Sequence, residues 1–191
     1  MKVLVLGGCG YTGSELVKFL LKKDIRVEVI DTQWFGKNLI KHKNLKVTKM
    51  KISEIDKYKF RNITSIIHLA NIANDPGVEL NPNLSWEVNV LDSYKIVNKA
   101  IKENVKQIIY ASSGSVYGVK KEKKVTEDLS NEPISTYNKT KMIAERVFLS
   151  YSNKIKIHCI RPATVCGYSS RIRLDVSVNN LTYQALKNKE I

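Results

Sequence analysis

The sequence is poor in cysteine and proline and has no long apolar segment. Among its 191 residues are four prolines and three cysteines, Cys9, Cys159 and Cys166. An odd number of cysteines without metal-ligand spacing argues against a disulfide framework and against a zinc site. No apolar run approaches the ~18 residues that a membrane span needs, and the apolar start of the chain runs into glycines rather than into a signal-peptide cleavage site. We therefore expect a cytoplasmic protein.

Acidic residues are also scarce, with 18 Asp and Glu against 32 Lys and Arg and a formal net charge of +14. Such a charge can indicate binding to nucleic acid. However, 26 of the 32 basic residues are lysines scattered along the chain, and their dense run at 120–124 is typical of a solvated loop. Recognition of base edges and bidentate binding of phosphate favour arginine instead. We expect no specific nucleic-acid partner, and a positive field that suits an anionic small molecule.

Short β-branched segments alternate with longer amphipathic ones along the whole chain. The pattern predicts helices at 14–22, 84–103 and 136–151, and strands at 3–6, 26–30, 45–49, 65–69, 107–111 and 155–160. Alternation of this kind is typical of βαβ units with right-handed crossovers and a parallel sheet. Because the strands are almost continuously apolar, helices should cover both faces of the sheet. We predict a single α/β domain over 1–191, built as a doubly wound parallel sheet.

A glycine-rich loop joins the first predicted strand to the first helix. Gly7, Gly10 and Gly13 recur at every third position. A side chain at the first position would obstruct the tight turn, and one at the second would hold the backbone away from a pyrophosphate. A side chain at the third would push the helix off the sheet. The start of the helix offers unpaired N–H groups and the positive end of its dipole to phosphate groups. In this context of strand, loop and helix, the pattern predicts a Rossmann-type dinucleotide site.

The second predicted strand is followed by Asp31, 18 residues after Gly13. A carboxylate at this point can accept hydrogen bonds from both ribose hydroxyls of adenosine and would repel a 2′-phosphate. The sequence therefore favours NAD over NADP as the cofactor. The alternative interpretation is that Asp31 only begins a turn.

Hydroxyl groups follow the strand predicted at 107–111, where Ser113 and Ser115 occur. Ligands of open α/β sheets bind at the carboxyl ends of such strands. Further along, Tyr137 and Lys141 are four residues apart on a predicted helix and therefore on one face. A nearby ammonium and a cationic nicotinamide ring would both favour the phenolate of a tyrosine. Such a pair can act as a proton shuttle, although a Tyr and a Lys at this spacing are, taken alone, more often a surface packing pair.

The order of these features resembles the extended short-chain dehydrogenases/reductases, and in particular their NAD-dependent nucleotide-sugar epimerases and dehydratases of the UDP-glucose 4-epimerase type. The resemblance covers essentially the whole chain. It rests on the glycine loop, Asp31, the His-Leu-Ala at 68–70, Asn89, the serine cluster, and Tyr137 with Lys141. The resemblance implies the Rossmann fold, an enzyme that uses NAD and a nucleotide sugar, and a homodimer formed through the helices that contain Asn89 and Tyr137.

The resemblance also implies roles for individual residues. Tyr137 would take a proton from a sugar hydroxyl, and Ser113 would bond the reacting sugar oxygen. Lys141 would hold the nicotinamide ribose and lower the pKa of Tyr137. Hydride would pass from sugar C4 to NAD and return to the opposite face of a 4-keto intermediate. Asn89 would be mainly structural, and His68 would be a packing and backbone-bonding residue rather than a catalyst.

The binding residues implied in the same way form two sets. NAD would be held by Gly7, Gly10, Tyr11, Thr12, Gly13, Asp31, Leu69, Ala70, Asn89, Tyr137, Lys141 and Pro162. The nucleotide sugar, with UDP as the expected nucleotide, would be held by Ser113, Ser115, Thr164 and Asn180.

The sequence departs from the family pattern at several of its positions. Dehydratases carry an Asp-Glu pair directly after the catalytic Ser or Thr, where this chain has Gly114 and Ser115. The acid and base for loss of water are therefore missing, which favours epimerisation over dehydration. Many epimerases have Asn at the position of Thr164, and relatives carry an Asp near the adenine about where Lys51 stands here.

Family members continue into a C-terminal substrate domain, which this sequence largely lacks. We therefore expect the NAD-binding part of such an enzyme, able to bind NAD but with weak or no turnover by itself. The alternatives are a dehydratase or reductase of the same family, or a non-catalytic NAD sensor or interaction protein on the same fold. A sensor has no use for Ser113, Tyr137 and Lys141, which favours the enzyme.

Overall fold

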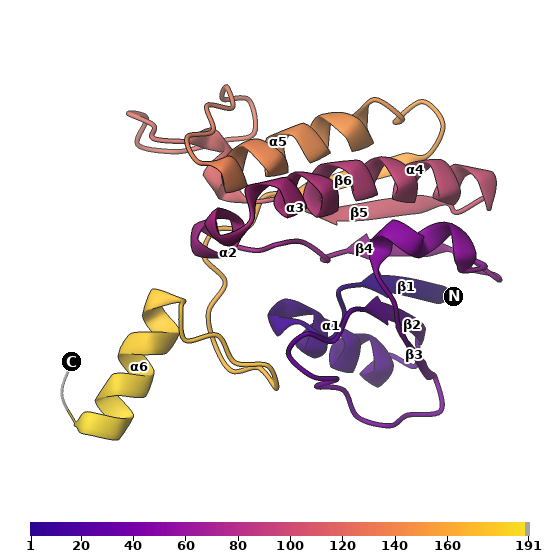
Figure 1. The fold of residues 1–191 in the computed structure, drawn as a ribbon, viewed down its shortest axis with the longest axis horizontal. Helices are drawn as coiled ribbons and strands as arrows, with labels where there is room; N and C mark the ends of the chain where they lie inside the picture. Colours follow the sequence, from indigo (N-terminus) through magenta and orange to yellow (C-terminus); the bar gives the residue numbers. More distant parts are fainter. Residues whose placement is uncertain (190–191) are drawn as a thin grey trace.

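The computed structural model describes residues 1–189 and contains a six-stranded parallel sheet with helices around it (Figure 1). The strand order is β3-β2-β1-β4-β5-β6. The strands are β1 (Lys2–Leu6), β2 (Arg26–Asp31), β3 (Leu45–Lys49), β4 (Ser65–His68), β5 (Gln107–Ala111) and β6 (Lys156–Ile160). The first three strands extend the sheet from β1 to β3 on one side, and the next three extend it from β4 to β6 on the other side. The direction in which strands are added therefore reverses between β1 and β4. Open α/β sheets bind ligands at such a reversal, and the predicted doubly wound fold is confirmed.

Helices lie on both sides of the sheet. Figure 1 shows α4 and α5 on one side and α1 on the other, while α6 projects away from the sheet. The α-helices are α1 (Tyr11–Lys22), α2 (Asp75–Leu80), α3 (Pro82–Trp86), α4 (Asp92–Lys102), α5 (Thr136–Leu149) and α6 (Ser177–Asn188). Two segments, η1 (Ile52–Lys57) and η3 (Gly114–Tyr117), are 3-10 helices, and η2 (Glu87–Leu91) is a π-helix. No helix in residues 1–189 is both long and apolar enough to cross a membrane.

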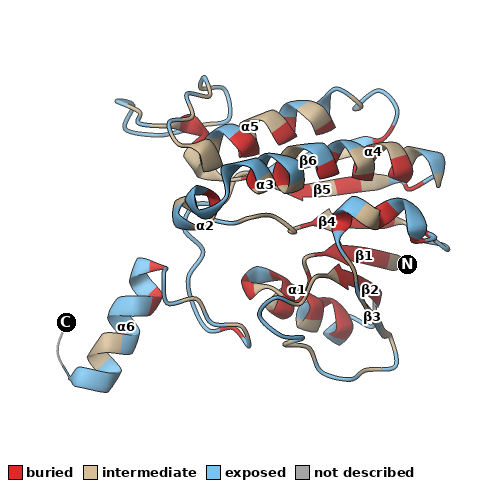
Figure 2. Ribbon diagram, viewed as in Figure 1, coloured by how far each residue is buried: buried red, intermediate tan, exposed pale blue. Residues whose placement is uncertain are grey.

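Two apolar clusters, one on each face of the sheet, form the core (Figure 2). On the first face, Ile66 and Ile108 of the strands meet Ile96 and Phe148 of α4 and α5. On the second face, alternate residues of β1 and β2 pack against Val17 and its neighbours in α1. This division follows from the alternation of side chains along a strand, which sends successive residues to opposite faces. The edge strand β6 is covered less, and its Ile160 is 54% exposed.

The structure differs from the expected elements mainly between residues 84 and 103. One continuous helix was the expectation, but the chain forms α3, one π-helical turn (η2) and α4. A π turn adds a residue to the helical turn and occurs frequently at functional sites. The carbonyl oxygen of Asn89, inside this turn, accepts a hydrogen bond from the Ser93 hydroxyl, and the Asn89 side chain bonds the backbone of Ile72 outside the helix. Helices α2 and α6 and the short turns η1 and η3 were not predicted, and α1 starts at Tyr11, inside the expected loop.

Candidate active site

The glycine loop between β1 and α1 is shaped by close backbone contacts. Gly7 has φ +83°, and a Cβ there would lie 2.6 Å from the amide nitrogen of Ala70. A Cβ on Gly13 would lie 2.3 Å from the carbonyl oxygen of Gly7. At Gly10, by contrast, the nearest atom within reach of a Cβ is 3.4 Å away, so no part of the chain itself requires glycine there. Close approach of a ligand to the backbone would explain why glycine stands at position 10, so the loop fits a bound diphosphate.

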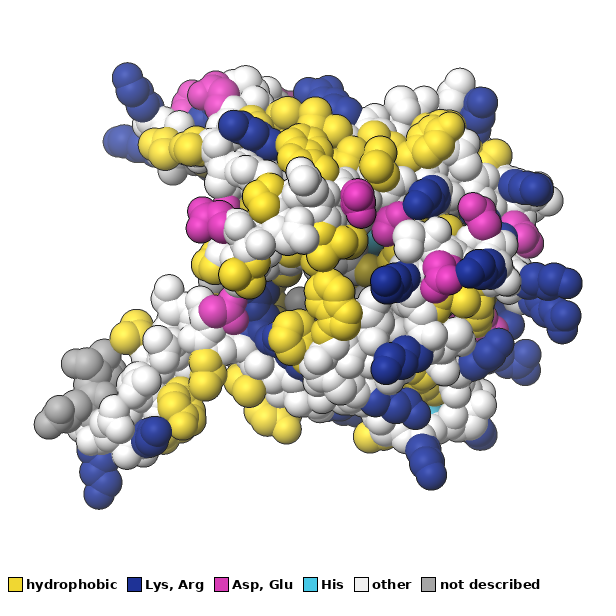
Figure 3. All heavy atoms as spheres, viewed as in Figure 1, with side chains coloured by type: hydrophobic (Ala, Val, Ile, Leu, Met, Phe, Trp, Pro, Cys, Tyr) yellow, Lys and Arg dark blue, Asp and Glu magenta, His cyan; other side chains and the backbone are white. Residues whose placement is uncertain are grey.

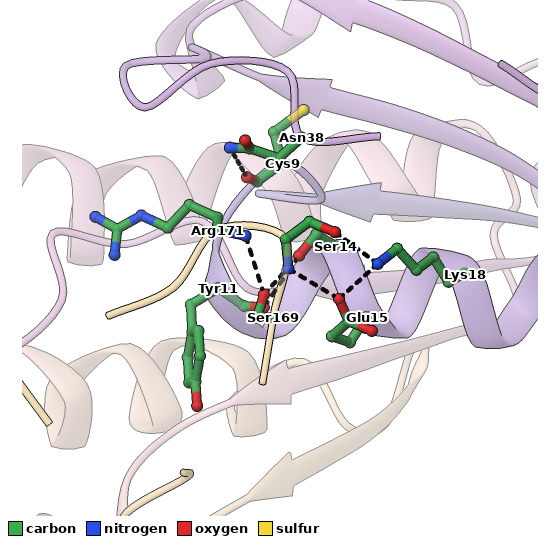
Figure 4. Close-up of polar contacts among 9 residues, drawn as sticks. Cys9, Tyr11, Ser14, Glu15, Lys18, Asn38, Ser169 and Arg171 are labelled. Atoms are coloured by element: carbon green, nitrogen blue, oxygen red, sulfur yellow. Dashed lines mark hydrogen bonds and ion pairs between the residues drawn. The ribbon is translucent and has the colours of Figure 1, made fainter. Parts of the chain in front are cut away.

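Asp31 closes one side of this loop. One carboxylate oxygen accepts the amide N–H of Cys9 at 2.9 Å, and the other accepts that of Gln33 at 2.6 Å. These bonds hold the carboxylate at the carboxyl end of β2, and each oxygen retains room for another donor. The side-chain amide of Asn38 donates to the carbonyl of Cys9 at 3.2 Å, so the segment after β2 is tied to the glycine loop as well (Figure 4). The arrangement is compatible with ribose hydroxyls at Asp31.

Leu69 and Ala70 follow β4 and border the same loop. The amide of Leu69 donates to the carbonyl of Leu6 at 2.8 Å, and Ala70 is the residue against which Gly7 fits. The two strand ends on either side of the reversal in strand order therefore meet here. Thr12, in the first turn of α1, is exposed beside them.

A C-terminal segment packs against the start of α1 (Figure 4). The phenol of Tyr11 donates to the carbonyl of Gly167 at 2.8 Å and accepts the side-chain amide of Asn179 at 3.1 Å. The hydroxyl of Ser169 donates to the carbonyl of Tyr11 at 2.7 Å and lies 2.9 Å from the hydroxyl of Ser14. These contacts join residues more than 150 positions apart, so no local sequence pattern predicts them.

Asn179 is the buried asparagine of this region, and Asn180 is exposed. The side-chain oxygen of Asn179 accepts the backbone N–H of Gly167 at 2.8 Å, and its side-chain nitrogen donates to the carbonyl of Arg173 at 2.9 Å. Asn180, which the resemblance assigned to the substrate, lies within 3.5 Å of Gln184 on the exposed side of α6. Thr164 is likewise exposed.

The three predicted catalytic residues come together near the carboxyl end of β5. Ser113 caps η3, its hydroxyl accepting the amide of Ser115 at 3.2 Å and lying 2.7 Å from the Ser115 hydroxyl. Tyr137 lies in the first turn of α5. Lys141, one turn further along, donates from Nζ to the carbonyl of Ala111 at 2.7 Å, and its Nζ lies 5.8 Å from the centre of the Tyr137 ring.

Burial controls the protonation of both members of the Tyr–Lys pair. Burial raises the pKa of Tyr137, and a hydrogen bond with the side chain of Ser113 only partly opposes the rise. Burial also lowers the pKa of Lys141 to about 7, against the opposing effect of the Glu145 carboxylate. Desolvation dominates the pKa shift at the phenol, and the Lys141 amine donates to the backbone of β5. The expectation that Lys141 lowers the pKa of Tyr137 stays a prediction.

Asn89 links three elements beneath the site. Its side-chain oxygen accepts the amide of Ile72 at 2.8 Å, and its side-chain nitrogen donates to the Ile72 carbonyl at 3.2 Å and to the Thr140 hydroxyl at 3.1 Å. The Thr140 hydroxyl in turn donates to the carbonyl of Tyr137 at 2.8 Å. Asn89 is completely buried, so in this structure it fixes the position of α5 relative to the segment after β4.

His68 is completely buried at the end of β4 and packs among aromatic rings. Its ring stacks on Tyr110 at 5.5 Å between centroids and meets the edge of Phe148 at 5.8 Å. Burial lowers the pKa of His68 to about 3, with the positive charge of Lys141 adding to the effect. Within residues 1–189 neither ring nitrogen has a hydrogen-bond partner, so the expected backbone bond is not formed and the side chain is a neutral packing residue.

A buried ion pair beside Lys141 was not predicted from the sequence. Glu145, only 1% exposed, accepts hydrogen bonds from Arg161 Nε at 2.9 and 3.2 Å and from Arg161 Nη2 at 2.7 Å. Arg161 also donates to the phenol of Tyr117 at 2.9 Å. The next residue, Pro162, accepts the amide of Gly114 at 2.8 Å through its carbonyl. The end of β6 is thereby fixed against α5 and the serine turn.

Comparison with known proteins agrees with this geometry. A family model described as "NAD dependent epimerase/dehydratase family" matches residues 3–190. The chain belongs to this family. A UDP-glucose 4-epimerase of Lactobacillus helveticus is 30% identical over 177 residues, which cover 89% of this chain and 53% of that relative. The chain therefore spans about half the length of this family member.

Solved structures of epimerases share the fold. A UDP-N-acetylglucosamine 4-epimerase from Methanobrevibacter ruminantium M1 superposes with a TM-score of 0.90 at 28% identity, covering 99% of this chain and 63% of that one. A UDP-glucuronic acid 4-epimerase from Bacillus cereus, solved in complex with NAD, gives a TM-score of 0.84 at 28% identity, covering 98% and 63%. The epimerase/dehydratase fold thus extends over nearly all of this chain.

Proposed function

We propose that this chain is the NAD-binding part of a nucleotide-sugar 4-epimerase and acts on a UDP-sugar. The observation that carries the proposal is the convergence of Ser113, Tyr137 and Lys141 at the carboxyl end of β5. The reversal of strand order and the glycine loop lie at the same edge of the sheet. Relatives and structural neighbours that are 4-epimerases of UDP-sugars, one of them bound to NAD, support the same reaction class.

The glycine loop and Asp31 would bind different parts of the dinucleotide. The tight turn at Gly7 and the open face at Gly10 would receive the diphosphate against the start of α1. Asp31 would accept the ribose hydroxyls and discriminate against a 2′-phosphate. When bound, NAD supplies the acceptor and donor of hydride for the sugar carbon.

Side chains at the end of β5 and the start of α5 would transfer the proton of the sugar hydroxyl. Tyr137 would take the proton of the sugar C4 hydroxyl as the carbon becomes a ketone, and would return it after the sugar presents its other face. Ser113 would donate a hydrogen bond to the same sugar oxygen and fix its distance from Tyr137. Asn89 and Thr140 hold the first turn of α5, and therefore the Tyr137 backbone, in place.

Epimerisation is favoured over dehydration by the turn after β5. The positions that follow Ser113 are Gly114 and Ser115, and the Ser115 hydroxyl lies 2.7 Å from that of Ser113. Neither residue offers a carboxyl group to remove water from the sugar. Ser115 instead extends the hydroxyl surface that would bind the substrate.

The test uses two measurements on the same chain. Calorimetry should detect binding of NAD in preference to NADP, and Asp31→Ala should weaken NAD binding at least tenfold. Mixing the NAD complex with UDP-glucose or UDP-glucuronic acid should then produce the absorbance of reduced nicotinamide only slowly, because weak turnover is expected of this chain by itself, and Tyr137→Phe should abolish that slow signal while NAD binding remains. Complete absence of reduction on long incubation with saturating sugar would favour the non-catalytic sensor, and the absence of NAD binding would refute the proposal.

We also propose that two copies of the chain associate through the helices η2, α4 and α5. Leu91 and Tyr94, on adjoining turns of η2 and α4, are 56% and 54% exposed although both are largely apolar. Pairing of such a face with its copy would remove these side chains from water. Sedimentation should show a dimer that Leu91→Glu dissociates; a monomer at every concentration would refute the pairing.

A further inference from the structure

Two adjoining hollows lie at the amino ends of β1, β2 and β3. The first has a volume of about 360 Å³ and the second about 300 Å³. Lys2, Glu28 and Lys46 line both, so the hollows form one continuous depression. The candidate active site lies at the opposite, carboxyl ends of the strands. Nothing in the proposed epimerase reaction uses this depression.

The depression is lined mainly by positive side chains. They come from β1, β2, β3 and the segments that precede β3 and β4, and six of them are Lys2, Arg26, Lys43, Lys46, Lys59 and Arg61. Figure 3 shows Lys and Arg side chains along the right edge of the molecule, where Figure 1 places the N-terminus and the start of β1. The fold thus collects at one place lysines and arginines that are scattered in the sequence.

Glu28 is the one acidic residue that lines the depression, and its charge is already engaged. It is 8% exposed, and its carboxylate lies 2.7 Å from the ammonium of Lys2 and accepts the phenol of Tyr58 at 2.6 Å. The ammonium of Lys46 lies 5.1 Å from the centre of the Tyr58 ring. Lys2 also donates to the carbonyl of Arg61 at 3.0 Å. These contacts build a fixed floor of Glu28, Tyr58 and Lys2 beneath the more exposed cations.

The exposed cations above this floor take no part in the ion pairs formed within residues 1–189. In the part of the chain that the structure describes, no carboxylate forms an ion pair with Arg26, Lys43, Lys46, Lys59 or Arg61. A concave surface of one charge concentrates ions of the opposite charge from solution. The depression is therefore suited to an anionic ligand.

We propose that the depression binds a small oligophosphate, with one phosphate group in each hollow. Arg61 lines the first hollow and Arg26 the second, and a guanidinium fork matches the oxygens of a phosphate better than an ammonium does. The shared Lys46 lies between them, where it can contact a bridging group.

The experiment titrates the full chain with inorganic tripolyphosphate by calorimetry, with orthophosphate for comparison. Tripolyphosphate should bind at least about tenfold more tightly than orthophosphate, because it can engage both hollows at once. Lys46→Glu/Arg61→Glu should weaken tripolyphosphate binding by about tenfold or more, since charge-assisted contacts are replaced by repulsion. Lys46→Gln/Arg61→Gln should weaken it less but clearly.

The matched control is Lys121→Glu/Lys123→Glu, which changes the net charge equally in an exposed loop away from the depression. It should change tripolyphosphate binding by less than about threefold, an effect of the overall field alone. Equal losses in the two charge-reversed proteins, or no preference for tripolyphosphate over orthophosphate, would overturn the proposal. Tighter binding of a DNA duplex than of tripolyphosphate, lost in the Lys46 and Arg61 variants, would assign the positive charge of the depression to nucleic acid instead. NAD binding, measured on the same samples, reports separately on the proposed epimerase site.

Discussion

Replacing Lys141 by methionine should change how the stability of the protein depends on pH. The ammonium is 4% exposed, and burial lowers the pKa of Lys141 from 10.5 to about 7. Between these two values the unfolded chain holds the proton and the folded chain does not. Stability of the wild type therefore rises with pH across this window, by about 1.4 kcal/mol for each pH unit from this group.

The expected magnitude follows from that slope. From about pH 7.5 to about pH 9, the free energy of unfolding of the wild type should rise by about 2 kcal/mol relative to Lys141→Met, because the variant lacks the titrating amine. The variant also loses the hydrogen bond to the carbonyl of Ala111, but that loss is a constant offset at all pH values. Other groups titrate in both proteins and cancel in the difference.

Urea unfolding followed by circular dichroism at several pH values measures this difference. Lys139→Met serves as the control, since Lys139 is exposed on the same helix, and its curve should run parallel to that of the wild type. If the free energies of the wild type and Lys141→Met also stay parallel across the pH range, the amine is not desolvated as described and the reasoning fails.

Further substitutions test the contacts of the site. Gly13→Ala should destabilise the protein by about 2 kcal/mol or more in urea unfolding, because its Cβ would lie 2.3 Å from a backbone oxygen, whereas Gly10→Ala should leave stability nearly unchanged and weaken NAD binding in calorimetry. Asn89→Ala should cost about 2 to 3 kcal/mol, since it leaves buried backbone groups of the segment after β4 without partners. Arg161→Met should cost about 3 to 5 kcal/mol by leaving the Glu145 carboxylate buried and unpaired, and the further change Glu145→Leu should restore much of that loss in thermal unfolding.

The fold could be predicted from the sequence because its main signals are local. Each strand is a short apolar run, and glycine is required at Gly7 and Gly13 by contacts within the loop and with Ala70, which follows the adjacent strand β4. The convergence of Ser113 with Tyr137 could also be expected, because in a parallel sheet the segments that follow the strands meet at one edge.

The parts that were not predicted depend on long-range polar contacts. The π turn at Asn89 interrupts a regular apolar period because the Asn89 side chain bonds the backbone of Ile72, a residue in another element. The contacts of Ser169 and Asn179 with Tyr11 leave no trace in local composition. One signal was available: Glu145 is a charged residue at a position of α5 that the apolar period assigns to the core, and a buried carboxylate requires a partner such as Arg161.

The protonation states of Tyr137 and Lys141 link the chemistry of the site to its ligand. Burial keeps the phenol neutral and leaves the amine only partly charged near neutral pH, so the chain alone does not supply the base. A cationic ring bound between them would favour the phenolate and would be repelled by the ammonium. Raising the pH removes both protons, and each removal makes the site more negative. Affinity for oxidised NAD should therefore rise with pH, whereas affinity for the reduced form, whose ring is uncharged, should change less. Calorimetry with both forms at several pH values measures this, and equal pH dependence would show that the nicotinamide ring does not contact the pair.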